Sequence, residues 1–121
     1  GGDDLLVAEV DECDGSFLMT RPVVAVITNA DPEHLDYYGT RDVLLSAFVT
    51  FANSVPFWSA ALLGIDHPGI KEIAPRITAR QIRFGFSPDA DLRAFSANTR
   101  GNGQVCHASL ASGEEFEFNL P

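Results

Sequence analysis

The chain has 121 residues, enough for one modest domain with a single core but too few for the several domains that a substrate-coupling ATP enzyme normally needs. Its hydrophobic fraction of 45% and charged fraction of 21% are ordinary for a globular protein, and they exclude disorder of the whole chain. The formal net charge is −9 and there is no basic patch, so nucleic acid and membrane surfaces are excluded as partners and divalent cations are favoured.

Cysteine content and the absence of targeting signals point to the cytoplasm. Cys13 and Cys106 are far apart and form no CxxC motif, which is typical of a reducing compartment. No apolar run approaches the roughly 18 to 20 residues that span a bilayer, and residues 1–4 lack the basic start of a signal peptide. The chain begins without Met and turns apolar almost at once, so we expect a piece of a longer protein.

Two short apolar runs near the N-terminus predict buried strands of a parallel sheet. Residues 5–10 are almost continuously apolar, and residues 23–28 are rich in β-branched side chains. After the second run, Asp31 is placed to cap a short helix that has Pro32 at its first position and ends at Gly39.

The middle of the chain continues the alternation of helix and strand. Apolar residues recur at helical spacing over residues 41–55, which predicts an amphipathic helix that packs on the sheet and ends at Pro56. Residues 59–64 predict a third buried strand, and residues 68–74 a short helix. This order is typical of an α/β fold with a mostly parallel sheet flanked by helices.

From residue 80 onward the pattern changes to short strands between Gly, Asn, Asp and Pro residues. We interpret this part as a small antiparallel C-terminal appendage with one solvent-exposed face. Residues 101–103 (GNG) predict a hairpin turn in it.

Acidic and imidazole side chains follow the first two predicted strands, where ligands of parallel sheets gather. The first strand leads into Glu9, Asp11, Glu12 and Asp14, and the second into Asn29, Asp31, Glu33 and His34. Oxygen-rich sites suit magnesium, but Glu9 at a strand end and His34 in a capped helix are also common as surface residues. His67 and His107 lack a clustered context and are interpreted as ordinary polar residues. Lys71 is followed by Glu72, so the chain carries no phosphate loop of the GK(S/T) type.

Two longer motifs carry a resemblance to the Mur ligases, specifically to the UDP-N-acetylmuramate:L-alanine ligases. Residues 7–18 (VAEVDECDGSFL) resemble the AExDExDxSF segment of that family, and residues 22–39 resemble its TNxxxDHxDxYG segment. Residues 48–57, 65–68 and 83–87 follow its order and spacing, so the resemblance covers essentially the whole chain. Departures from the family pattern are Cys13, Glu33 and Trp58-Ser59, none of which removes a candidate ligand.

The resemblance implies part of an ATP-dependent carboxylate-amine ligase, which joins L-alanine to UDP-N-acetylmuramate through an acyl phosphate in peptidoglycan precursor synthesis. It implies Glu9 and His34 as catalytic residues and Mg²⁺ ligands, and Asn29 and Asp31 on the nucleotide or substrate side. Residues 1–121 would be a partial central ATP-binding domain, without the upstream phosphate loop and the downstream GxHN segment. We therefore expect an inactive fragment, and a tendency to self-associate through an exposed sheet edge.

Two alternatives stay open at this point. One is a non-catalytic α/β module that binds magnesium or nucleotide. The other is an unrelated hydrolase that uses the acidic cluster with His34 as the base.

Overall fold

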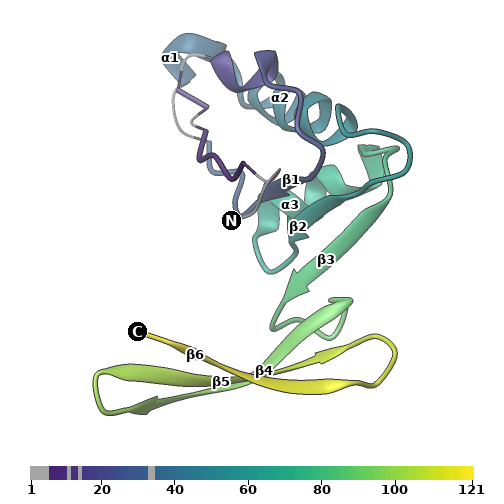
Figure 1. Ribbon diagram of the computed structural model, residues 1–121. Helices are drawn as coiled ribbons and strands as arrows, with labels where there is room; N and C mark the ends of the chain where they lie inside the picture. The colour runs from purple at the N-terminus through teal and green to yellow at the C-terminus, as the bar shows by residue number, and fades with distance from the viewer. Residues whose placement is uncertain (1–5, 11, 14, 33–34) are drawn as a thin grey trace.

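The computed structural model describes residues 6–10, 12–13, 15–32 and 35–121. Within these residues the strands form one sheet of six in the order β1-β2-β3-β4-β5-β6 (Figure 1). Its parallel part contains β1 (Ala25–Ile27), β2 (Ala61–Gly64) and β3 (Gln81–Gly85). Parallel strands need long crossover connections, and helices occupy those connections here, so the predicted α/β class is confirmed.

The helices pack on one face of the parallel strands. Ile27 and Leu63 are opposite each other in the register of β1 and β2, and both are buried against the helices. Leu44 and Ile70 complete the centre of this core, each with an exposed fraction of 0%. In Figure 1 the long helix and the helix after β2 lie beside the parallel strands. The helical elements are η1 (Ser16–Met19), α1 (Leu35–Tyr38), α2 (Arg41–Asn53), α3 (Pro68–Ile73) and η2 (Ala74–Arg76).

Local capping explains where α2 begins. The Thr40 hydroxyl accepts a hydrogen bond from the Val43 amide at 3.2 Å, which satisfies one of the free amides of the first turn. The predicted helix over 41–55 is confirmed, and it ends two residues earlier than predicted, at Asn53. The predicted end of the short helix at Gly39 is also confirmed, since α1 ends at Tyr38, Gly39 has a φ of 81°, and its amide donates to the Leu35 carbonyl.

A bidentate ion pair joins the outer surfaces of α2 and α3. Arg41 Nη1 donates to Glu72 Oε1 at 2.9 Å, and Arg41 Nη2 donates to the other carboxylate oxygen. This hydrogen bonding lowers the pKa of the Glu72 carboxyl and raises that of the Arg41 guanidinium. Both side chains are about half exposed, at 50% and 48%, so salt screens the pair.

The C-terminal strands form the predicted antiparallel extension. They are β4 (Leu92–Arg100), β5 (Gly103–Leu110) and β6 (Glu115–Leu120), paired antiparallel in sequence order. They project away from the helices in Figure 1. The predicted hairpin turn joins β4 to β5, with Gly101 at a φ of 64°.

The predicted boundary at residue 80 is wrong for β3. This strand pairs parallel with β2, and β4 continues parallel to β3 through Phe84 opposite Leu92. The antiparallel part therefore begins with the pairing of β4 and β5, and it extends the same sheet. The direction of β3 is set by the helical crossover before it, which its alternating sequence does not reveal.

The predicted strand over residues 5–10 is wrong for its described part. Residues 6–10 form no strand, and Leu6 and Val7 have exposed fractions of 89% and 86%. A buried strand needs a hydrogen-bonded neighbour and cover on its faces, and the described part of the sheet ends at β1. Among the described residues, Phe17 is the first along the chain that is buried in the core, and its ring centroid lies 5.2 Å from that of Phe51.

The predicted helix capped by Asp31 is wrong at its start. Pro32 lies outside α1, which spans Leu35–Tyr38, while residues 33 and 34 are outside the described residues. The carboxylate of Asp31 accepts a hydrogen bond from His67 instead. Asp31 therefore bonds to a residue distant in sequence instead of capping a helix locally.

Candidate functional site

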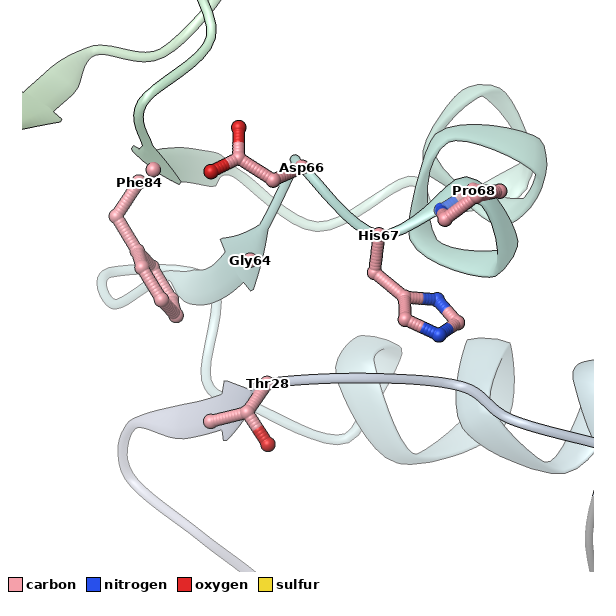
Figure 2. Close-up of a pocket in the computed structure, with 7 residues that line it drawn as sticks. Thr28, Gly64, Asp66, His67, Pro68 and Phe84 are labelled. Carbon is pink, nitrogen blue, oxygen red and sulfur yellow. The ribbon is translucent and has the colours of Figure 1, made fainter.

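A cavity of about 360 Å³ lies where the parallel strands end (Figure 2). Its lining residues come from the ends of β1, β2 and β3 and the start of α3. They are Thr28, Gly64, Asp66, His67, Pro68, Phe84 and Gly85. The carboxyl ends of parallel strands are the usual place for ligands in open α/β sheets, so this edge is the candidate site.

Glycines allow the backbone segments around the cavity to approach closely. A Cβ at Gly64 would lie 2.7 Å from the Thr28 carbonyl oxygen, and a Cβ at Gly85 would lie 2.7 Å from the Asp66 carboxylate. Gly85 also has a φ of 149°, a backbone conformation that residues with a side chain rarely adopt. Any larger residue at either position would push the walls of the cavity apart.

Asp66 fixes the loop between β3 and β4. One of its carboxylate oxygens accepts from the Phe86 amide at 2.7 Å, and the other accepts from the Ser87 amide at 2.8 Å. Arg93 also holds this loop, since its Nε donates to the Phe86 carbonyl at 3.1 Å. The carboxylate therefore closes one wall of the cavity by ordering backbone amides.

His67 connects the ends of β1 and β2. Its Nε2 lies 2.7 Å from Asp31 Oδ1, and its Nδ1 accepts from the Gly69 amide at 3.1 Å and caps α3. Figure 2 shows the His67 and Asp66 side chains pointing in opposite directions from the loop after β2. The two side chains thus hold two different loops at the same edge of the sheet.

The sequence-predicted site residues are only partly brought together. Glu9 is exposed in a segment without regular structure, and His34 lies outside the described residues, so the predicted convergence of these two stays a prediction. Asn29 is exposed beside Thr28, with its Nδ2 3.4 Å from the Thr28 hydroxyl. Asp31 lies at the predicted edge, where it meets His67. No cluster of three or more metal-ligating side chains occurs among the residues that the structure describes.

Asp66 and His67 line the candidate site, although the local sequence does not single them out. Asp66 lies two residues beyond the end of β2, as Asn29 does beyond β1, and His67 lies three residues beyond β2, where Asp31 is four beyond β1. The rule that ligands gather at the ends of parallel strands would have found them if it had been applied to the third predicted strand. The neighbours of His67 in sequence form no cluster, and its partner Asp31 is 36 residues away, so the local sequence does not reveal their contact.

Comparison with known sequences links the chain to one family. The family model described as the Mur ligase middle domain matches residues 4–121. A UDP-N-acetylmuramate–L-alanine ligase of Sorangium cellulosum is 52% identical over 101 residues, which make up 84% of this chain and 22% of that protein. The corresponding protein of Rhizorhabdus wittichii is 51% identical over 94 residues, or 77% of this chain and 20% of that protein. The chain spans about a fifth of the length of these curated relatives.

Solved structures share the fold at low sequence identity. A UDP-N-acetylmuramate-alanine ligase from Thermotoga maritima has a TM-score of 0.72 at 18% identity, and the match covers 91% of this chain and 24% of that one. A MurF ligase from the same organism, crystallised in complex with ADP, has a TM-score of 0.64 at 19% identity and covers 84% of this chain and 23% of its own. Similarity at this level supports the arrangement of strands and helices.

Within the described residues, no helix is long and apolar enough to cross a membrane.

Proposed function

The chain belongs to the Mur ligase family, as part of its middle domain, and we propose that it is part of an enzyme that joins L-alanine to UDP-N-acetylmuramate using ATP. The observation that carries this proposal is the 52% identity, over 84% of the chain, to a ligase with that name. The reaction would be a step of peptidoglycan precursor synthesis in the cytoplasm. The chain would contribute one wall of the nucleotide site rather than the whole active site.

The chemistry explains why acidic residues near an anionic substrate are useful. A carboxylate resists attack by an amine, so a ligase of this kind first transfers a phosphoryl group from ATP to form an acyl phosphate. The amine then attacks the acyl carbon, and phosphate leaves with the bonding electrons. Both reactants of the first step are anions, and a bound Mg²⁺ would supply the charge neutralisation that lets them approach.

The residues present fit magnesium in their chemistry. Glu9 offers an exposed carboxylate, and Thr28, Asn29 and Asp31 place further oxygen atoms at the end of β1. Hard oxygen donors with open positions for water and phosphate are the usual environment of Mg²⁺. We propose Glu9 and His34 as the side chains that hold the ion, with Asn29 and Asp31 on the nucleotide side of the same edge.

The phosphates need a binding loop that these residues do not contain. The sequence has no glycine-rich turn followed by Lys and Ser or Thr, and its single lysine, Lys71, precedes Glu72 in α3. The relatives are about five times longer than their match to this chain, which leaves room for such a loop elsewhere in them. The ADP bound to the MurF ligase of similar fold supports a nucleotide next to this kind of domain.

The test is an alanine-dependent phosphate-release assay on the full-length protein that contains this chain, with ATP, Mg²⁺ and UDP-N-acetylmuramate. Glu9→Gln and His34→Ala should each lower kcat/KM on the order of 100-fold, the usual effect of removing one electrostatic contact to the reacting groups. Glu115→Gln is the matched control, since it neutralises an exposed acid on β6, in the extension that projects away from the helices.

Two results would overturn the proposal. One is a wild-type protein that releases no phosphate in response to L-alanine. The other is an active protein in which Glu9→Gln and His34→Ala behave like the Glu115 control. Nucleotide binding without turnover would favour the alternative of a non-catalytic binding module.

A further inference from the structure

The hydrogen bonds of His67 determine which of its ring nitrogens carries the proton. Its Nδ1 accepts from the Gly69 amide, so this nitrogen is unprotonated. The ring proton of the neutral imidazole is therefore on Nε2, which faces Asp31 Oδ1 at 2.7 Å. A neutral histidine thus donates to a carboxylate at one end while it caps α3 at the other.

The segment after β1 also makes close contacts with backbone at two glycines, Gly64 of β2 and Gly69 of α3. Gly64 leaves room for the Thr28 carbonyl, and a Cβ at Gly69 would lie 2.6 Å from the Ala30 carbonyl oxygen. Ala30 is buried, with an exposed fraction of 1%. These contacts set how close the segment lies to β2 and α3, but they are steric contacts and not hydrogen bonds.

The hydrogen bond from His67 adds a directional contact to these steric ones. The His67 side chain is 25% exposed and the Asp31 side chain 49%, so water reaches the pair only in part. Among the hydrogen bonds found for the described residues, it is the side-chain bond that links the segment after β1 to the segment after β2. The segment so held contains Asn29, and it leads in sequence to His34.

We propose that His67 is a positioning residue: through Asp31 it holds residues 28–32 against the ends of β2 and α3. The inference rests on the proposed function, because what it positions is the segment that leads to the candidate Mg²⁺ ligand. The Oδ1 oxygen of Asp31 serves this hydrogen bond, whatever its other carboxylate oxygen contributes on the nucleotide side. Partners that orient metal-binding segments typically change metal affinity or activity by about 10- to 100-fold when removed.

The test compares variants that separate the two hydrogen bonds of His67 in the full-length protein. In His67→Asn the shorter side chain can still cap α3, because Asn is a favoured capping residue, but it cannot reach Asp31. Asp31→Ala removes the acceptor, and Asp31→Asn keeps an acceptor oxygen. The control is Arg41→Gln, which removes a side-chain link between α2 and α3 on the outer surface.

Hydrogen exchange and Mg²⁺ dependence are the two measurements. His67→Asn and Asp31→Ala should speed amide exchange of residues 28–31 about tenfold, and should raise the Mg²⁺ concentration for half-maximal activity by about the same factor. For His67→Asn, which changes no residue assigned to the nucleotide or the ion, the kcat at saturating Mg²⁺ should stay within about twofold of wild type. A general loss of folded protein would instead lower kcat and leave half-saturation unchanged. Arg41→Gln should resemble wild type in both measurements, and Asp31→Asn should resemble wild type in amide exchange. The double variant His67→Asn/Asp31→Ala should exchange no faster than either single variant.

The inference is overturned if His67→Asn leaves both the exchange of residues 28–31 and the Mg²⁺ half-saturation unchanged. Fully additive effects of the double variant on the amide exchange of residues 28–31 would also overturn it, because two residues that act through one bond cannot have additive effects. A wild-type protein without ligase activity would refute the proposed function instead. In that case the exchange measurement alone decides whether His67 positions the segment.

Discussion

Gly69 offers a test in which two opposing effects of one methyl group can be compared. It is the second residue of α3, where alanine would ordinarily favour the helix by up to about 1 kcal/mol. In this structure, however, the new Cβ would lie 2.6 Å from the Ala30 carbonyl oxygen and 3.2 Å from His67 Nδ1. The first contact is with backbone, which cannot move aside without shifting the segment after β1.

The magnitudes favour destabilisation. Forcing an extra methyl group into a filled site costs about 1–3 kcal/mol. A shift of the segment would also stretch the hydrogen bond between His67 and Asp31, with a net loss of about 1 kcal/mol. Against a helix gain of at most about 1 kcal/mol, we expect Gly69→Ala to lower the free energy of unfolding by about 2 kcal/mol.

Urea unfolding followed by far-ultraviolet circular dichroism measures this change. With a slope of about 1.5 kcal/mol per molar urea, the midpoint should fall by about 1 M. Lys71→Ala is the control, because it makes an alanine at an exposed position of the same helix and should leave the midpoint almost unchanged. A Gly69→Ala protein as stable as wild type, or more stable, would refute the argument that α3 and the segment after β1 are in backbone contact.

Two further predictions concern the loops and the surface. Asp66→Ala removes the acceptor of two loop amides, so those amides should exchange about tenfold faster and the protein should lose about 1–2 kcal/mol of stability. Asp66→Asn should give effects between those of wild type and Asp66→Ala. Unchanged amide exchange would contradict the role given to this carboxylate. Glu72 has a pKa lowered below its ordinary value of 4.5 by its hydrogen bond to Arg41, so the pair stabilises the fold at neutral pH and this contribution is lost as the pH falls through the folded-state pKa. The midpoint difference between wild type and Glu72→Gln should therefore be small at neutral pH and shrink in acid or high salt, and a difference that grows in acid would contradict this sign.

Local patterns in the sequence were enough to predict the fold class and much of the order of elements. The apolar residues of α2 recur every three or four positions, and residues with that spacing lie on one common face only when the segment is a helix. Gly39 and the GNG turn mark chain reversals because few other residues accept their backbone angles. The long motifs around Glu9 and His34 indicated the family, which the match of residues 4–121 confirmed.

Tertiary structure decided the features that depend on neighbours distant in sequence. Residues 6–10 are apolar enough for a strand, yet they are exposed, because burial depends on which segments pair with β1 and not on composition. The direction of β3 depends on the crossover that precedes it, since an alternating strand fits parallel and antiparallel pairing alike. Asp31 was free by its local sequence to cap a helix, and it binds His67 because the sheet brings the ends of β1 and β2 to one edge.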